Sequence, residues 1–455
     1  MVGRFVVFLS LVTALLVFCI AAAAPQAARA QAAGATDAER LRELERRLET
    51  SQKLIERLSE RIGELERAAA PKSKAETAPP TMAEQAKSIA TLQESVEQIS
   101  SGLSRTVTNT GVPIHGFADA GTAWSSRQDR IRLRGFGVGT LDLYLAPQFG
   151  DHVKSLVEIA LEYGADGAGE IDAERMQLGY VLDDSMTLWA GRFHTPIGLW
   201  NTAYHHGANL QTSIYRPRFI DFEDKEGVLP VHSVGVWGSG KIGLGQEKLS
   251  YDAYLANGPT IRHGRLDYNA FSDDNGSKLF GFNLNWDPKA TLRGASVGLH
   301  AFRTTADTRL ATGALHSRTR VRMLGGYLGY DAHGWEGMAE YYRFANSDLG
   351  TGTRRSSQAG YLQIGRNYGT LTPYARYERA ALDGADNFFV AQRVGRSYTR
   401  GSIGARYDLD ARAALKVELG VTREDASLLI DETGAAIATG QARYRRLAVQ
   451  YSIAF

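Results

Sequence analysis

The sequence predicts an all-β protein, a transmembrane barrel of about 16 antiparallel strands, preceded by a signal peptide and an α-helical coiled-coil segment. Three observations predict this fold class. No stretch after the first 30 residues offers the roughly 20 continuous apolar residues that a membrane-spanning helix needs. From residue 116 onward, hydrophobic residues recur with a period of two, in segments of about ten residues. The last of these segments ends on an aromatic residue, Phe455.

The composition fits a barrel better than a helical membrane protein. Hydrophobic residues make up 44% of the 455 residues, and the mean hydropathy is -0.25. A helical membrane protein of this length would be far more apolar. The 48 glycines exceed the usual share of about 7%, and many tight turns would use them.

Residues 1–30 read as a secretory signal peptide. Arg4 supplies the positive start, an apolar run follows to Ala24, and Ala28-Arg29-Ala30 fits the small-x-small cleavage pattern. The alternative is a single membrane anchor, because the apolar run is long enough to span; the cleavage pattern favours the signal peptide. The only cysteine, Cys19, lies in this segment, so the remaining chain forms no disulfide.

The net charge predicts that nucleic acid is not a partner of this protein. Removing Arg4 and Arg29, the only charged residues of the signal segment, from the net charge of +2 leaves zero for the rest of the chain. A neutral chain lacks the basic surplus of nucleic-acid binders. Any role of charge must therefore be local.

Residues 31–66 are predicted to form a coiled coil. Positions spaced three and four residues apart are apolar except for one serine: Leu41, Leu44, Leu48, Ser51, Ile55, Leu58, Ile62 and Leu65. Arg40 and Arg61 fall opposite Glu45 and Glu66 of a parallel neighbour, and Leu54 widens the apolar stripe, which favours a trimer. The alternative is one amphipathic helix lying on another surface.

Two further segments separate this helix from the barrel. Residues 67–81 are rich in Ala and Pro and are predicted to be a linker. Residues 82–114 hold a second, shorter heptad run and a polar connection. The barrel is then assigned to residues 115–455.

The last segment shows the barrel pattern most clearly. Large apolar side chains alternate with small or polar ones, so one face can contact lipid and the other water; the apolar positions are Leu447, Val449, Tyr451, Ile453 and Phe455. An alternating segment with a terminal aromatic residue resembles the signal by which the barrel-assembly machinery recognises outer-membrane barrels. Tyr451, Ile453 and Phe455 are the residues expected to carry it.

Segments of this kind total about 16, an even number as bacterial barrels require. Their centres lie near residues 120, 140, 157, 177, 189, 235, 251, 281, 297, 323, 339, 361, 375, 403, 418 and 450. Short turns alternate with long polar loops, among them 194–230, 304–317 and 345–357. Both ends of the barrel then lie on the short-turn side, which places the coiled coil in the periplasm of a bacterium with an outer membrane.

The longest loop, 194–230, is the third on the outer side and is a candidate to fold inward and narrow the channel. It carries a cluster of charged residues as constriction candidates: Arg216, Arg218, Asp221, Glu223, Asp224, Lys225 and Glu226.

Arginines that alternate along strands are candidates to line the pore. Two trios form ladders, Arg130, Arg132 and Arg134, and Arg318, Arg320 and Arg322; Arg175, Arg376 and Arg406 also take the inward phase. Rings of arginine suit anion pathways. The alternative is that the ladders lie above the membrane among loop tips and lipid headgroups.

No cofactor, metal or catalytic group is expected. His205 and His206 lie in the long loop, with His194 before and His232 after it, but no tight ligand spacing is present, so ordinary hydrogen-bonded histidines are the better interpretation. No Gly-x-Ser-x-Gly elbow occurs, and the chain is not expected to be an enzyme.

Three stretches resemble the phosphate-selective porin O/P family and related trimeric porins. They are Met186-Thr-Leu-Trp-Ala-Gly-Arg-Phe-His-Thr-Pro-Ile-Gly198, Tyr251-Asp-Ala-Tyr-Leu-Ala-Asn-Gly258 and Leu371-Thr-Pro-Tyr-Ala-Arg-Tyr-Glu378. The heptad leader resembles that of trimeric porins that pass dicarboxylates. The resemblance implies a 16-stranded homotrimer, with phosphate selectivity resting on arginine ladders and loop lysines. In this chain the third loop holds a single lysine, Lys225.

The sequence therefore predicts an outer-membrane porin for passive diffusion of small hydrophilic solutes, with a preference for anions such as phosphate or dicarboxylates. Its expected partners are outer-membrane lipid, the assembly machinery and two further copies of the chain. The alternative function is an adhesin or structural tether that works through the coiled coil.

Overall fold

The computed structural model describes residues 114–127, 135–163, 169–204, 208–223, 225–245, 247–267, 273, 275–289 and 291–455. The predicted signal peptide, coiled coil, linker and second heptad run lie outside these residues, apart from Ile114, where the first strand begins.

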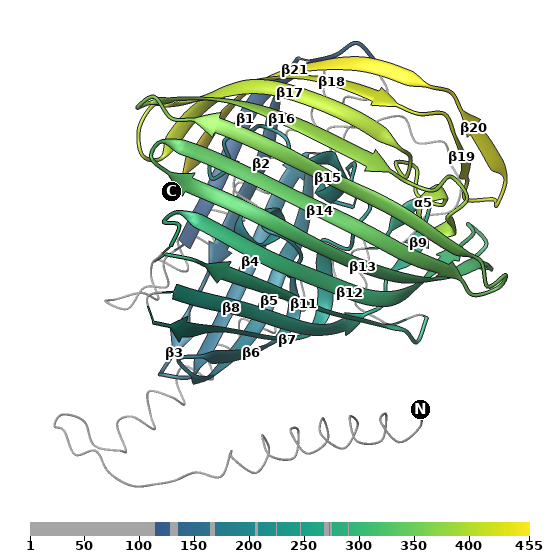
Figure 1. Cartoon of the computed structure of the whole chain (residues 1–455), viewed down its shortest axis with the longest axis horizontal. Coiled ribbons are helices and arrows are strands. Elements are labelled where there is room, and N and C mark those ends of the chain that lie inside the picture. The colour runs from purple at the N-terminus through teal and green to yellow at the C-terminus, as the bar shows by residue number, and fades with distance from the viewer. Residues whose placement is uncertain are drawn as a thin grey trace, which may run out of the picture. The chain divides into compact units, whose positions relative to one another are not determined.

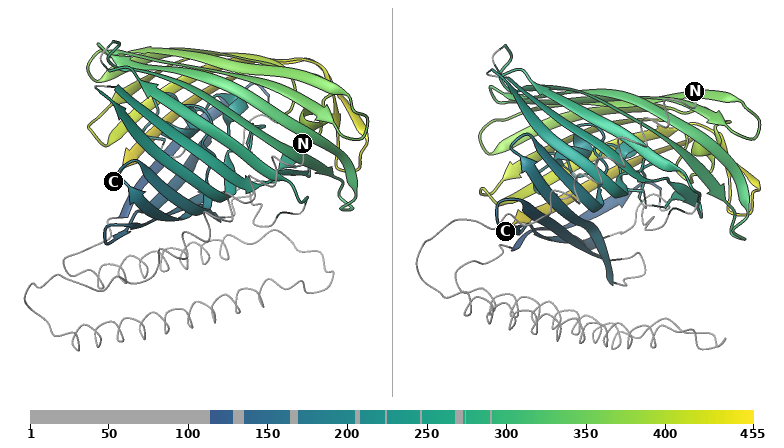
Figure 2. Two further views of the ribbon diagram at one scale, coloured as in Figure 1. Left: turned by 60° about the horizontal axis from the view of Figure 1, so that its bottom comes forward. Right: turned by 90° about the horizontal axis from the view of Figure 1, so that it is seen from below.

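Sixteen long strands form a closed antiparallel β-barrel (Figures 1 and 2). They are β1 (Ile114–Ser125), β2 (Gly135–Leu145), β4 (Val153–Tyr163), β5 (Gly169–Asp183), β6 (Met186–His194), β7 (His232–Leu244), β8 (Glu247–Asn257), β11 (Lys278–Asp287), β12 (Ala295–Arg309), β13 (Leu315–Ala332), β14 (Trp335–Asp348), β15 (Arg354–Arg366), β16 (Leu371–Ala381), β17 (Tyr398–Asp408), β18 (Ala413–Glu424) and β21 (Ala442–Ala454).

Shorter elements lie in the connections. The strands are β3 (Gln148–Phe149), β9 (Thr260–Arg262) and β10 (Arg265–Leu266), together with a separate hairpin of β19 (Ser427–Ile430) and β20 (Ala436–Thr439). The helices are α4 (Trp200–Ala203), the 3-10 helix η2 (Arg218–Ile220) and α5 (Asn387–Val390). None of the described helices is long and apolar enough to cross a membrane.

The first and last strands close the barrel. β1 pairs with β21 from Phe117 opposite Ala454 to Ser125 opposite Arg446. The backbone N–H groups of Gly116 and Phe455 each donate to the other residue's carbonyl oxygen, both over 3.0 Å. A Cβ atom on Gly116 would lie 2.5 Å from Cζ of the Phe455 ring, so this closure needs a glycine.

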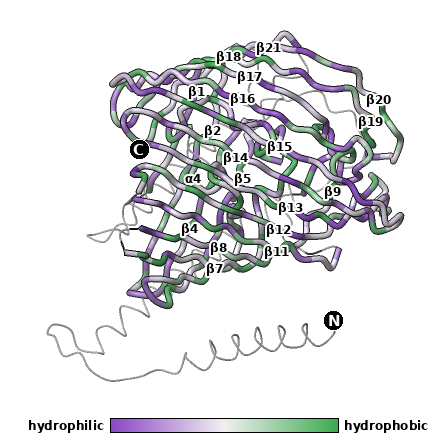
Figure 3. Tube along the Cα trace, in the orientation of Figure 1, coloured by the Kyte–Doolittle hydropathy of each residue, from purple (hydrophilic) through white to green (hydrophobic). Residues whose placement is uncertain are grey.

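The predicted strand positions are confirmed, because each of the sixteen predicted centres lies within one strand of the barrel. Hydrophilic and hydrophobic residues alternate along the strands (Figure 3). Large apolar side chains point outward and stay exposed; Ile403 is 60% exposed and Leu324 58% exposed. This is the surface expected of strands whose outer face contacts lipid.

Two predicted loops are wrong in length. Strands β12 to β15 extend through most of 304–317 and 345–357 and leave only 310–314 and 349–353 as connections. β13 has 18 residues, whereas about 9–11 suffice to cross a bilayer. The strand ends in these ranges are polar, but their backbones keep the same ladder partners, so the sheet continues past the apolar outer surface.

The interior holds a hydrophobic cluster as well as polar groups. Val321 and Met323 of β13, Phe344 of β14 and Phe389 of α5 pack with Ile220 and Leu229, which lie in the connection between β6 and β7. That connection therefore brings its own apolar side chains to the inner face of the wall.

Candidate channel lining and inward-folded loop

The connection 195–231, between β6 and β7, lies inside the barrel. Its two ends are held together, because Thr195 N donates to Val231 O over 2.8 Å and Asn201 Nδ2 donates to Thr195 O over 2.8 Å. Its polar contacts reach β4, β14, β16, β17, β18 and β21, which are not neighbours of β6 and β7. A segment that bonds to the inner face of strands so far around the wall must cross the lumen. We call residues 195–231 the inward loop.

The first anchor of the inward loop is Glu340 on the inner face of β14. Its carboxylate accepts hydrogen bonds from Trp200 N over 2.7 Å and Leu199 N over 3.1 Å, at the start of α4. The hydroxyls of Tyr342 and Tyr361 donate to the same carboxylate over 2.6 and 2.7 Å. Four donors satisfy a side chain that is 3% exposed, as a buried carboxylate requires.

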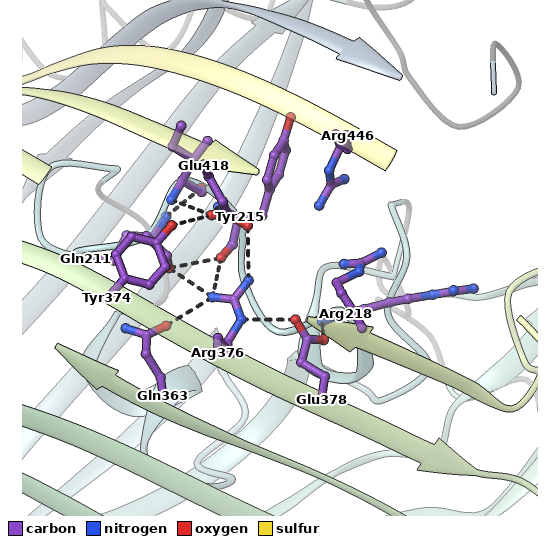
Figure 4. A network of polar contacts seen from close by, with 12 residues as sticks. Gln211, Tyr215, Arg218, Gln363, Tyr374, Arg376, Glu378, Glu418 and Arg446 are labelled. Atoms are coloured by element: carbon purple, nitrogen blue, oxygen red, sulfur yellow. Dashed lines mark hydrogen bonds and ion pairs between the residues drawn. The ribbon is translucent and has the colours of Figure 1, made fainter. Parts of the chain in front are cut away.

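The second anchor is Arg376 on β16, at the centre of Figure 4. Its guanidinium donates to Tyr215 O over 2.9 Å and to Ser213 Oγ over 3.0 Å, both in the inward loop. Two carboxylates neutralise its charge, Glu378 at 3.0 Å and Glu418 at 3.5 Å. The arginine therefore binds protein groups rather than an open water path.

Glu418 on β18 also holds the loop backbone. It accepts from Ile214 N over 3.0 Å, from Tyr215 N over 3.2 Å and from the Tyr374 hydroxyl over 2.7 Å. An inward-pointing carboxylate of β18 thus accepts the hydrogen bonds of two backbone N–H groups of the inward loop.

The third anchor joins Arg218 and Glu226 of the inward loop to the wall. Arg218 Nη1 lies 2.7 Å from Glu424 of β18, and its backbone N–H donates to Glu378 over 2.7 Å. Glu226 lies 2.8 Å from Arg400 of β17. Burial alone would raise the pKa of Glu226, but the charges of Arg400, Arg218 and Arg446 lower it below its ordinary range.

A fourth group of contacts lies near Ala208 and Asn209. Arg406 of β17 donates to the carbonyl oxygens of Asn209 and Gln211, and Lys416 of β18 donates to Ala208 O. Cationic side chains here act as donors to backbone carbonyls of the inward loop.

The other side of the inward loop meets an acidic wall. Glu223 accepts from the backbone N–H groups of Val231 and His232, and its carboxylate lies 3.2 Å from Nδ1 of His232. Nε2 of the same ring lies 2.7 Å from Glu174 of β5. Lys225 lies 3.2 Å from Glu162 of β4. Mixed charges, and not arginine alone, therefore surround the loop.

Asp221 is a carboxylate of the inward loop whose hydrogen bond stays within its own segment. Its carboxylate accepts from its neighbour's backbone, Phe222 N, over 2.9 Å. Burial raises its pKa to about 6, against the lowering effect of the charges of Lys225 and Arg216. Arg216 itself is directed elsewhere, since its guanidinium donates to Ile220 O and Asn201 Oδ1 and lies over the Phe222 ring.

The predicted site residues fall into four groups. Arg130, Arg132, Arg134 and Asp224 lie outside the described residues. Arg216, Arg218, Glu223 and Arg376 are at most 5% exposed, so they support the inward loop rather than line a water path. Arg175, Lys225, Glu226 and Arg406 lie on the inner side and are partly accessible, with side chains 16–31% exposed. Asp221, also in the inward loop, is partly buried and belongs to none of these groups.

The fourth group, Arg318, Arg320 and Arg322, corrects a prediction. These side chains share the face of β13 that carries the exposed residues Leu324 and Leu328, so they point outward. The alternating positions Val321 and Met323 point inward, into the hydrophobic cluster under the inward loop. An apolar position on a barrel strand usually faces lipid; here the apolar positions Val321 and Met323 face the interior, so the arginines that alternate with them face outward.

The anchors Glu340, Glu378, Glu418, Glu424 and Arg400 were not among the predicted site residues. Their signal was present, because each is a charged residue at the inner phase of an otherwise alternating strand. Which loop atom each would meet could not be read from spacing.

His194 and His232 are the two described histidines at the ends of the inward loop. The rings of His194 and His232 lie 5.5 Å apart between their centroids, and Glu174 and Glu223 engage His232. Within the described parts of the chain, no group of three or more His, Cys, Asp or Glu side chains is arranged to hold a metal ion. His205 and His206 lie outside the described residues.

Comparisons with known proteins bear on the fold alone. No protein-family model and no curated protein matches the sequence. Among solved structures, OmpT, an outer membrane protein of Vibrio cholerae, matches with a TM-score of 0.50 and 10% identity, over 76% of this chain and 97% of that one. The anion-selective porin from Comamonas acidovorans matches with a TM-score of 0.49 and 14% identity, over 75% and 99%. The outer membrane channel DcaP of Acinetobacter baumannii matches at 0.45 and 12%, over 76% and 97%. The likeness to OmpT shows a shared barrel fold.

Proposed function

We propose that the protein is a porin of the bacterial outer membrane, through which small hydrophilic solutes pass by diffusion. One observation carries the proposal: a closed 16-stranded barrel with an exposed apolar exterior contains a long loop that is bonded across its lumen. Barrels of this strand number can enclose an aqueous channel, and a segment across the lumen limits its width. Such a role needs no cofactor and no catalytic group.

We propose that solutes pass along the charged side chains of the inner surface that are partly accessible. On the described inner surface these include cationic and anionic groups, and several of them form ion pairs with each other. Arg175 pairs with Glu158, Lys225 with Glu162, and Arg406 with Asp408; Asp172, 34% exposed, lies 3.8 Å from Arg192.

We propose weak charge selectivity in place of the anion preference expected from the arginine ladders. One ladder points outward, and the accessible inner arginines are neutralised by carboxylates. A phosphate preference, which the short motifs imply by resemblance, stays a prediction. So do the homotrimer and the periplasmic coiled coil.

Conductance in planar bilayers tests the proposed function. The purified protein should produce stable steps, and a homotrimer should give steps in groups of three. A protein that inserts, resists proteolysis and yet passes no ions or sugars would rule out a diffusion channel.

A further inference from the structure

Arginines point outward at one end of the neighbouring strands from β12 to β21, and eight of them form one group. They are Arg303, Arg320, Arg322, Arg343, Arg379, Arg423, Arg443 and Arg445, and we call them the outer arginine belt. None of the eight forms an ion pair with any residue that the structure describes, whereas nearby Arg318 is paired with Asp307 at 2.7 Å. The belt therefore carries a large uncompensated positive charge.

The belt borders the apolar outer surface. On each of its strands the next outward residues are apolar. Ala301 and then Leu299 come before Arg303 on β12, Leu324 adjoins Arg322 on β13, and Tyr377 adjoins Arg379 on β16. Leu299, Leu324 and Tyr377 are 55–58% exposed. The cationic groups thus lie where an apolar surface that fits lipid tails gives way to a polar one.

Strand register places some of these like charges directly opposite one another. Arg303 is the partner of Arg322, and Arg423 is the partner of Arg443. Arg379 lies in the same lateral row as the second pair, with Thr399 between it and Arg423. Like charges directly opposite each other destabilise a sheet, so these pairs call for an anion from outside the chain.

The belt lies at the end of the barrel opposite to both of its termini. Arg443 is near the start of β21 and Arg379 near the end of β16, the same end from which the inward loop departs. Strands β2 and β5 present apolar residues near that end instead, Phe136 and Ile171, which are 94% and 60% exposed. Among the described residues the belt therefore lies on one side of the wall, on the green-to-yellow strands of Figure 1.

We propose that the outer arginine belt binds the phosphate groups of a phosphorylated lipid in the outer leaflet, of the lipid A class. The inference rests on the proposed outer-membrane location. Planar guanidinium groups bind phosphate oxygens in bidentate fashion, and two arginines side by side fit one phosphate. The apolar residues next to them contact the acyl chains, so the site recognises an amphiphile with an anionic headgroup.

Binding of bis-phosphorylated lipid A to the detergent-purified full-length protein, followed by native mass spectrometry, tests the proposal. Two double variants remove the opposed pairs: Arg303→Gln with Arg322→Gln, and Arg423→Gln with Arg443→Gln. Each arginine near a charged membrane surface contributes about 1 kcal/mol, so each double variant should bind at least about tenfold more weakly. High salt should weaken wild-type binding, because exposed charges are screened.

A matched control removes two exposed arginines from the turns at the opposite end, Arg293→Gln with Arg412→Gln. This variant should bind the lipid as the wild type does. Equal lipid binding by all variants would overturn the proposal, and so would complete displacement of the lipid by inorganic phosphate, which would indicate a free-anion site.

Conductance separates this inference from the proposed function. All three double variants should keep the wild-type conductance, because none of these arginines touches the inward loop. If the belt variants lose lipid binding and keep normal conductance, the result supports lipid binding by the belt independently of channel function. If the wild type binds lipid but conducts no ions, the lipid site stands and the proposed porin function is wrong.

Discussion

At the scale of single residues, the interior is organised by carboxylates that accept several hydrogen bonds each. Glu340 accepts four and Glu418 accepts from two backbone N–H groups and a tyrosine. Each lies on a strand, and its donors lie wholly or partly on the inward loop. One rigid acceptor thereby positions several atoms of a segment that has little regular structure of its own.

Replacing Glu340 with glutamine should loosen α4. The amide keeps one acceptor oxygen but turns an NH₂ group toward two of the four donors. Leaving buried donors unsatisfied costs about 1 to 3 kcal/mol, which should appear as lower stability in denaturant and faster proteolysis between residues 195 and 231. Glu247→Gln is the control, because Glu247 accepts one bond from Trp286 at an exposed site. Identical behaviour of both variants would contradict the anchoring role.

Asp221 should make the inward loop less stable as pH rises. Its folded pKa of about 6 lies above the ordinary value of 3.8, so between these values the folded protein holds a proton that the unfolded chain has released. Stability from this group is therefore largest at low pH and is lost as pH rises to about 6. Asp221→Asn, neutral at all pH, should be more stable than wild type at pH 7.5 and similar at pH 3, below both pKa values. Thermal unfolding of both proteins at the two pH values measures this; a constant difference would contradict it.

At the scale of elements, the strands could be predicted and the loop contacts could not. Strands follow from period two, which one face toward lipid and one toward the interior imposes on every strand. In β18, for example, Lys416 and Glu418 alternate with the exposed residues Leu415, Val417 and Leu419 and lie on the inner face. The prediction that Arg318, Arg320 and Arg322 line the pore was wrong, because the inward loop makes part of the interior apolar. Leu324 and Leu328 occupy the same alternating positions as these arginines, and both are exposed on the outer face. Contacts such as Glu340 with Trp200 join positions 140 residues apart, and local pattern carries no information about them.

Replacing Pro196–Pro230 with a short Asn-Gly turn should open the channel. The strand ends permit this, because Thr195 and Val231 are already joined by a backbone hydrogen bond and His194 pairs with His232. The wall strands pair with one another without the loop, so the barrel should fold, and single-channel conductance should rise severalfold. Replacing the hairpin of β19 and β20, which carries exposed Leu428 and Ile437, is the control and should not change conductance. An unchanged conductance after loop removal would mean that the loop does not restrict the path.

At the scale of the whole molecule, charge is distributed differently on its two surfaces. Inside, arginines and carboxylates are paired; outside, the arginine belt has no acidic partner among the described residues. A net charge of +2 for the chain conceals this arrangement.

The paired interior predicts a small reversal potential. In a tenfold gradient of potassium chloride, wild type should show weak preference between the two ions, because accessible cations and anions balance along the path. Arg175→Gln, which leaves Glu158 without that partner, should shift the preference toward cations, while Arg293→Gln, in the turn between β11 and β12, should not. A strongly anion-selective wild type would show that the inner charges are not balanced.

The bonds of the inward loop also set the order in which the molecule can be built. Residues 195–231 leave the ribosome before their partners on β14, β16, β17 and β18, and Ile214 is separated from Glu418 by 204 positions. The loop cannot reach its final place until those strands have joined the wall. Assembly must therefore curl the sheet around a segment that is still unattached, and docking of that segment is one of the last steps. Until then its backbone donors remain solvated, and protease cleavage near Tyr215 would report how far assembly has advanced.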